Sequence, residues 1–519
     1  MSLPLAETMI RAASHAIAGK TGDALAELCR ARDAGQRSPR LLDAIGHLQF
    51  ELRQFPAASD TYQESLRMED GDSTTHYNRA VCLERLEDWA NAAAEFEKAI
   101  ELDSRRASAH LGLGISRLHL GQPAEALTAF EKCLERQPFR EAALRGQAVA
   151  LHLLERFQEA AGCNQRLLAR DPRSEELLGN AISVAIARGD FEALAQCAAR
   201  LIEIQPGSRI GLEGAALAAF ARRDFDAAAR CSAALVEAHP GHFAGWFNYG
   251  VALQRMGEYE KATYAYSVAT SLDRRSAEAY LSLGSALAET GRLDEARNAY
   301  EEALALAPQM KTALWNLGLL YEGRGEPRHA ESLYARLVEY YPDAQDAWFR
   351  LGYVRLHLGE LPEAIQAFEA CLALPKKCPE ALMNIGVALW KMHNLEAAKE
   401  AFRQCLNSAR PVEALRYLAA IALEQQEYEQ ALTLHKQLLE MDEPSSDLLH
   451  NLALLYQKRG RPAEAVRHYR QALGLRPDFP QAQINLGHAL MALGKHEEAQ
   501  AAWQEALRGN VELAEQFLV

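Results

Sequence analysis

Two short stretches of this sequence contain residue types that could bind a phosphate or a metal ion. Ala18-Gly19-Lys20-Thr21 has the Gly-Lys-Thr ending of a phosphate-binding loop, but Ser14 stands where such a loop needs its first glycine. His239 and His242 flank a Pro-Gly pair, yet a metal site needs further ligands and no third one is evident nearby. Neither stretch therefore predicts phosphate or metal chemistry.

The rest of the sequence lacks the residue patterns on which common catalytic sites depend. It has no serine at a nucleophile turn with His and Asp partners, no H-E-x-x-H motif and no glycine-rich nucleotide loop. The nine cysteines include no C-x2-C pair, and they recur where small packing residues are expected. We therefore predict no enzyme activity, no cofactor and no metal, and we interpret the cysteines as free thiols in a reducing compartment.

The residue types that do indicate a function are large aromatic or Met side chains with Asn, Arg or Lys beside them. Clustered aromatic and Arg side chains on a surface are typical of the hot spots of protein interfaces. We predict that a partner protein is bound by Phe247, Asn248, Trp315, Asn316, Phe349, Arg350, Tyr353, Met383, Asn384, Trp390 and Lys391.

A pattern that recurs at an interval of 34 residues must position these side chains. Counted from the first residue of each repeat, positions 8 and 20 are small and positions 4, 17 and 24 are mostly large. Apolar residues at helical spacing on both sides of a glycine-containing break predict two antiparallel helices joined by a tight turn. The stretch 243–276 shows the pattern with Trp246, Gly250, Gly257, Tyr259, Ala262, Tyr266 and Ala269.

This spacing resembles the tetratricopeptide repeat, a helix-turn-helix unit of 34 residues. We place repeat starts at Leu5, Pro39, Ser73, Ala107, Glu141, Glu175, Arg209, Phe243, Ala277, Lys311, Gln345, Pro379, Val412, Ser446 and Pro480. The resemblance implies an all-α fold, an α-solenoid in which antiparallel helix pairs stack into a right-handed superhelix.

The repeats predict one continuous solenoid over residues 1–519. Seven N-terminal repeats occupy 5–242 and are more divergent at 141–242, eight C-terminal repeats occupy 243–513, and 514–519 form a short cap. The sixth repeat has Ile182 and Leu194 at the two small positions, which predicts a splayed helix pair. These large residues are either compensating core substitutions or the cause of a local change in superhelical pitch.

In this repeat family the first helices line the inner groove. Positions 2, 5, 9 and 12 share one helical face, and the aromatic and Met residues predicted to bind a partner occupy positions 5, 9 and 12. An alternative is that these aromatics pack across the concave wall, and Asn at position 6 belongs to the common repeat pattern. The family's clamp for acidic chaperone tails is incomplete, because only Asn316 and Arg350 match it, while Leu281, Ser285 and Asp346 do not.

Composition narrows the class of function. A formal net charge of -14 disfavours general binding to nucleic acid or to anionic membranes. No stretch is long and apolar enough for membrane insertion, and the N-terminus lacks a secretory signal, so we expect a cytoplasmic protein. Richness in Ala, Leu and Arg favours a bacterial source.

We predict a non-catalytic scaffold or adaptor that binds a peptide or helix of a partner protein in the concave groove. Two alternatives stay open at this point. The chain could be a structural protein that assembles with copies of itself, or it could be the regulatory or targeting arm of an enzyme, such as a glycosyltransferase, supplied in trans.

Overall fold

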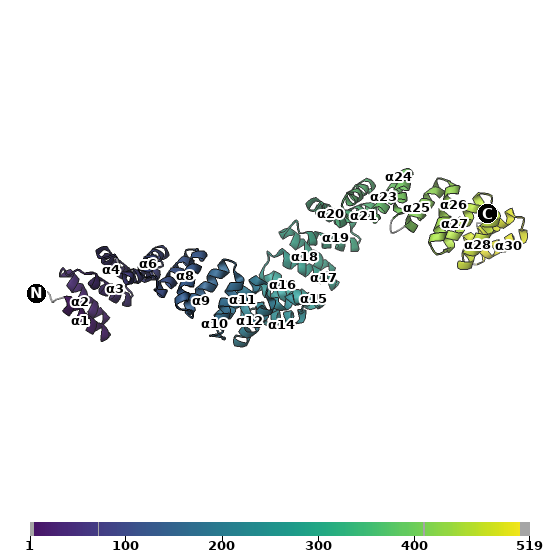
Figure 1. The fold of residues 1–519 in the computed structure, drawn as a ribbon. Helices are drawn as coiled ribbons and strands as arrows, with labels where there is room; N and C mark the ends of the chain where they lie inside the picture. The colour runs from purple at the N-terminus through teal and green to yellow at the C-terminus, as the bar shows by residue number, and fades with distance from the viewer. Residues whose placement is uncertain (1–4, 71, 408–410, 509–519) are drawn as a thin grey trace. The chain divides into compact units, whose positions relative to one another are not determined.

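The computed structural model describes residues 5–70, 72–407 and 411–508. These residues form thirty α-helices, and they include no strand. The chain divides into two compact units, an N-terminal half, Met1–Asp273, and a C-terminal half, Arg274–Val519. Successive helices lie side by side within each half (Figure 1), and the all-α fold expected from the sequence is confirmed.

Eight helix pairs make up the described part of the N-terminal half. Their bounds are α1 (Leu5–Ile17), α2 (Thr21–Asp33), α3 (Pro39–Glu51), α4 (Phe55–Met68), α5 (Ser73–Arg85), α6 (Trp89–Leu102), α7 (Ala107–His119), α8 (Pro123–Arg136), α9 (Glu141–Leu153), α10 (Phe157–Leu168), α11 (Glu175–Arg188), α12 (Phe191–Ile204), α13 (Arg209–Ala221), α14 (Phe225–Ala238), α15 (Phe243–Arg255) and α16 (Tyr259–Leu272).

Seven helix pairs make up the described part of the C-terminal half. Their bounds are α17 (Ala277–Glu289), α18 (Leu293–Leu306), α19 (Lys311–Gly323), α20 (Pro327–Tyr340), α21 (Gln345–Leu358), α22 (Leu361–Leu372), α23 (Pro379–Lys391), α24 (Leu395–Cys405), α25 (Pro411–Glu424), α26 (Tyr428–Met441), α27 (Ser446–Lys458), α28 (Pro462–Leu475), α29 (Pro480–Ala492) and α30 (His496–Leu507). The cap expected at 514–519 lies outside the described residues.

A glycine at position 8 meets an aromatic ring at position 24 in many of these helix pairs. A Cβ atom on Gly250 would lie 2.6 Å from the ring of Tyr266, and one on Gly352 would lie 2.7 Å from the ring of Phe368. Both rings are fully buried. The missing side chain therefore lets the ring of the second helix pack directly on the backbone of the first.

Position 20 is completely buried in all fifteen repeats, as alanine in fourteen of them and as Leu194 in the sixth. Ile182 is buried as well, and both residues belong to one apolar cluster. A Cβ atom on Gly214 of the next repeat would lie 3.2 Å from Leu194 Cδ1 and 3.4 Å from Ile182 Cγ2. The absent side chain at Gly214 therefore makes room for the two large residues, which supports compensating core substitutions, while the splayed pair stays a prediction.

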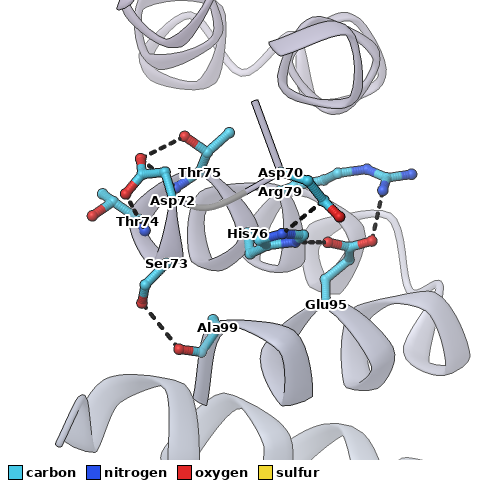
Figure 2. Close-up of polar contacts among 9 residues, drawn as sticks. All are labelled: Asp70, Asp72, Ser73, Thr74, Thr75, His76, Arg79, Glu95 and Ala99. Atoms are coloured by element: carbon cyan, nitrogen blue, oxygen red, sulfur yellow. Dashed lines mark hydrogen bonds and ion pairs between the residues drawn. The ribbon is translucent and has the colours of Figure 1, made fainter. Parts of the chain in front are cut away.

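Capping side chains and prolines fix where many helices begin. Asp72 precedes α5 and accepts hydrogen bonds from the backbone N–H groups of Thr74, at 3.0 Å, and Thr75, at 3.2 Å (Figure 2). Pro379 and Pro480 occupy the first positions of α23 and α29, where no backbone hydrogen bond is lost.

Within the described residues, no helix combines the length and the hydropathy that a membrane crossing requires.

Candidate functional site

A buried polar cluster at the third repeat has the residue types of an acid–base site. His76 Nδ1 lies 2.6 Å from Glu95 Oε2, and His76 Nε2 lies 3.3 Å from Asp70 Oδ1 (Figure 2). Arg79 Nη1 donates to Glu95 Oε1 at 2.6 Å. The His76 side chain is 2% exposed and both ring nitrogens face carboxylates, so neither is free to exchange a proton with a substrate. The cluster therefore joins α5 to α6, and the sequence analysis missed it.

The two stretches considered for phosphate and metal chemistry are turns with structural contacts. Gly19 adopts a φ of 73° in the turn between α1 and α2, and Lys20 precedes α2 without a side-chain cap. His239 Nε2 lies 2.8 Å from the carbonyl oxygen of Gly207. His242 Nδ1 accepts from the backbone N–H of Gly245 at 3.1 Å. No group of three metal-ligating residues occurs among the described residues.

Burial raises the thiol pKa of eight of the nine cysteines. Burial raises the pKa of Cys82 to about 12, and burial also raises the pKa of Cys133 and Cys405. A thiol with a raised pKa is a poor nucleophile, because the thiolate is the reactive form.

A groove of about 830 Å³ lies over α21, α23 and α25 in the C-terminal half. These are the first helices of the eleventh, twelfth and thirteenth repeats. The groove is lined by Phe349, Tyr353, Pro379, Glu380, Met383, Asn384, Val387, Trp390, Glu413, Arg416, Tyr417 and Ala420. It therefore brings together five of the eleven residues that the sequence singled out, namely Phe349, Tyr353, Met383, Asn384 and Trp390.

Aromatic contacts hold the walls of this groove in place. The ring of Phe349 packs against that of Phe368, with centroids 5.8 Å apart, and Tyr353 keeps 37% of its surface exposed. Trp390 and Tyr417 meet edge to face at 5.7 Å. The Tyr417 ring in turn stacks on a buried core ring, so the wall rests on the core of the helix pair.

Charged residues also line the groove. Glu380 and Glu413 lie on the first turns of α23 and α25, where a carboxylate also stabilises the helix dipole. Arg416 Nη2 lies 2.5 Å from Asp442 Oδ2. The lining thus combines apolar and aromatic side chains with a few charged ones.

Other predicted residues of the C-terminal half lie outside the lining of this groove. The Trp315 ring packs edge-on against Tyr334 at 5.9 Å, and Lys391 is exposed at the end of α23. Arg350 Nη1 donates to Glu322 Oε2 at 3.3 Å, and the Tyr334 hydroxyl also donates to Glu322. Burial, together with this carboxylate, raises the pKa of Tyr334.

Asn316 takes part in a separate polar contact. It lies within hydrogen-bond reach of the Tyr300 hydroxyl, whose pKa burial raises. The same hydroxyl donates to Ser285 Oγ at 3.4 Å. Asn316, on α19, therefore helps to join its repeat to α18 of the preceding repeat, and a role for it in binding stays a prediction.

Phe247 and Asn248 belong to α15 of the N-terminal half. The Phe247 ring stacks on Phe243 at 5.9 Å and meets Tyr266 at 5.8 Å. These contacts account for the placement of the ring, and its role in binding is a prediction.

Four lining residues on the thirteenth repeat were missed by the sequence analysis. Glu413, Arg416 and Ala420 occupy positions 2, 5 and 9, and Tyr417 occupies position 6. Positions 2, 5 and 9 belong to the helical face that is expected to line the groove, so the sequence did contain a signal for three of these residues. It was overlooked because the thirteenth repeat has no aromatic residue at positions 5, 9 or 12.

Comparisons with known proteins agree on the kind of repeat. One family model, described as tetratricopeptide repeat, matches residues 44–109, 111–175, 214–277 and 315–380. These four matches together cover about half of the chain. Further tetratricopeptide models match 275–343, 379–411, 411–478 and 457–515.

Among curated proteins, the chain is similar to the photosystem I assembly protein Ycf3 of Synechococcus elongatus. The two are 35% identical over 92 residues, which is 17% of this chain and 53% of Ycf3. The Ycf3 of Cyanophora paradoxa is 33% identical over 91 residues, 17% of this chain and 48% of that protein. The chain therefore spans about half the length of the curated relatives that it matches.

Among solved structures, similarity extends to MamA and to YrrB, which is described as a tetratricopeptide protein with an unusual peptide-binding site. MamA is 26% identical, with a TM-score of 0.31 and coverage of 32% of this chain and 90% of MamA. YrrB is 24% identical, with a TM-score of 0.34 and coverage of 36% of this chain and 97% of YrrB.

Proposed function

Because the chain belongs to the tetratricopeptide repeat family, we propose that it is a non-catalytic scaffold that binds a segment of a partner protein in the groove over α21, α23 and α25. The observation that carries this proposal is the groove itself, about 830 Å³ in volume and lined by Phe349, Tyr353, Met383, Trp390 and Tyr417. Stacked repeats present extended surfaces of this kind to their partners.

The residues of the groove fit an interface better than a solvated wall. Tyr353 is 37% exposed, and Trp390 is half-buried and lines the groove. Covering such rings with a partner removes apolar surface from water, and aromatic anchors of this type dominate binding free energies. Trp315, Asn316, Arg350, Lys391, Phe247 and Asn248 remain proposed contributors to binding, outside the lining of this groove.

The test is a quantitative pull-down from native lysate with the parent chain and with Tyr353→Ala and Trp390→Ala. Tyr340→Ala is the matched control, because Tyr340 has the same 37% exposure as Tyr353 but lies at the end of α20, outside the lining set. All variants are first compared by helical circular dichroism and melting. We expect Trp390→Ala to weaken a groove-bound partner by about 2 kcal/mol, roughly thirtyfold.

The outcomes separate the proposal from its alternatives. A partner retained by the parent and by Tyr340→Ala, but lost by the two groove variants, supports the proposal. A partner retained equally by all four proteins contradicts it. Capture of the chain's own copies, with a mass that rises with concentration, would favour the self-assembling protein, and capture of an enzyme would favour a regulatory arm.

We further propose a reducing compartment, the cytoplasm, as the place of action, and a bacterial source on the basis of composition. Packing of Cys82, Cys133 and Cys405 as buried core residues supports the first point, because such thiols serve as small apolar side chains. Fractionation of the source cells would test the compartment.

A further inference from the structure

The groove continues beyond α25. A second cavity, of about 420 Å³, lies over α25, α26 and α27, and both cavities are lined by Arg416 and Ala420. Its lining includes Leu423 and Leu448, which are at least half-buried. One ligand can therefore run across the first helices of four successive repeats, from α21 to α27.

Carboxylates outnumber cationic groups along this path. Glu380, Glu413, Asp442 and Asp447 line the two cavities, together with a single guanidinium, that of Arg416. That guanidinium already lies 2.5 Å from Asp442. Among the residues that line the two cavities, carboxylates therefore outnumber guanidinium groups by four to one.

The carboxylates differ in how far their charge is already compensated. Asp447 Oδ1 lies 2.8 Å from Arg476 Nη2, so its charge is partly balanced by a residue outside the groove. Glu380 is half-buried and makes no ion pair with any residue that the structure describes. Glu380 is thus the carboxylate best placed to meet a cation of the ligand.

Three of these carboxylates also have a local explanation. Glu380, Glu413 and Asp447 stand at position 2, in the first turns of α23, α25 and α27, where negative charge stabilises a helix. Asp442 stands outside this position, at the end of α26, and it still lines the groove. These carboxylates act on a ligand in the groove through their electrostatic field even where they also stabilise a helix.

The histidine of the second cavity adds no compensating charge near neutral pH. His435 is buried, its Nδ1 lies 2.8 Å from the carbonyl oxygen of Ala431, and burial lowers its pKa.

We propose that the occupant of this groove is a cationic, apolar segment of a partner protein. Its large apolar side chain contacts Met383, Val387 and Trp390, and a Lys or Arg a few residues away pairs with Glu380. This inference rests on the proposed function, because it names the chemistry of the partner that the same groove takes. Charge complementarity decides between segments of similar apolar content, since like charges face to face are strongly disfavoured in an interface.

An anionic segment fits the same path poorly. It would approach four carboxylates, and its only cationic lining partner, Arg416, would have to leave Asp442. The groove therefore selects against acidic tails as well as for basic segments.

The experiment selects random linear peptides displayed on phage with the full-length chain, and then measures the affinity of synthetic copies by fluorescence anisotropy. We expect the selected peptides to combine Trp, Phe, Leu or Met with Lys or Arg. Their affinity should fall about thirtyfold with Trp390→Ala and about tenfold or more with Glu380→Lys, and it should weaken as salt is raised.

Asp346→Lys is the matched control for Glu380→Lys. Asp346 occupies the same position of the preceding repeat, but its side chain is 74% exposed, lies 3.5 Å from Lys376 Nζ and does not line either cavity. This reversal should change the affinity less than twofold.

The possible results distinguish the failure of the cationic occupant from the failure of the groove function. Selected peptides that are acidic or uncharged, and that Trp390→Ala still weakens, overturn the cationic occupant and leave the groove function standing. Peptides that neither Trp390→Ala nor Glu380→Lys affects overturn both. A selection that yields no peptide overturns the cationic linear segment, while the lysate pull-down still tests the groove.

Discussion

The indole Nε1 of Trp390 donates a hydrogen bond of 2.8 Å to Glu424 Oε2, one repeat further along the chain. Trp390 lies on α23 and Glu424 ends α25, so the bond joins two first helices across the groove wall. It fixes the ring at the place where the partner segment is proposed to bind.

The first prediction concerns this bond. Glu424→Ala should weaken a groove-bound peptide about fivefold, because the exposed bond to a carboxylate contributes about 1 kcal/mol to holding the ring. Glu424→Gln keeps an acceptor and should retain most of the affinity. Fluorescence anisotropy of the bound peptide measures both, and equal losses for the two variants would show that the charge matters rather than the ring.

The second prediction concerns the contact between Gly352 and Phe368. Gly352→Ala places a Cβ atom about 2.7 Å from the buried ring, so the free energy of unfolding should fall by about 1–3 kcal/mol. Gly162→Ala is the control, since a Cβ atom there meets nothing within 4 Å in the middle of α10. That change should raise stability by about 0.5–1 kcal/mol. Urea titration followed by circular dichroism measures both, and a common sign would contradict the packing argument.

The third prediction concerns the buried cluster of Figure 2. Glu95→Ala leaves His76 and Arg79 without their shared carboxylate, so it should cost about 3 kcal/mol of stability. The double variant His76→Tyr/Glu95→Ala should recover part of this loss, because the ninth repeat has Tyr280 and Ala299 in the same two positions. Thermal melting distinguishes the two variants, and a double variant less stable than Glu95→Ala would rule out the exchange.

The fourth prediction concerns pH. Burial lowers the pKa of His435 below its usual 6.5, so folding holds the ring neutral while the unfolded chain protonates it. The stability that His435 contributes is therefore complete above about pH 6.5 and is lost as pH falls below that value, at up to about 1.4 kcal/mol per pH unit.

His435→Tyr should flatten this acid-side loss, because position 24 is an aromatic residue in most other repeats. Some slope should remain from His450 and His468, whose pKa values burial also lowers. Denaturant titrations at about pH 7.5 and about pH 5.5 test this. An unchanged pH dependence in His435→Tyr would show that other groups cause it.

The fold could be predicted almost entirely from the sequence, because the same packing residues recur at the same positions in most repeats. Gly250 and Tyr266 stand at fixed positions, and the contact between them follows from those positions alone. The polar cluster could not be predicted in this way. Asp70, His76 and Glu95 belong to unrelated positions, and only the packing of α5 against α6 brings them together.

The candidate groove was predictable in outline but not in extent. The positional rule indicated Tyr353 and Trp390, and both line the cavity. The same rule also indicated Trp315, which packs against Tyr334 instead of lining the groove. Which rings stand in the groove depends on how neighbouring side chains are arranged, and residue type at one position does not specify that arrangement.

Gly214 makes room for Ile182 and Leu194 of the preceding repeat, and this has a consequence for how the gene can be edited. A deletion of the seventh repeat alone would bring Asn248 of the eighth repeat to the place of Gly214. We therefore expect the sixth and seventh repeats to be deleted or duplicated only together. Deletions and duplications should be inherited in that pair, whereas repeats built on the glycine–ring contact can be exchanged one at a time.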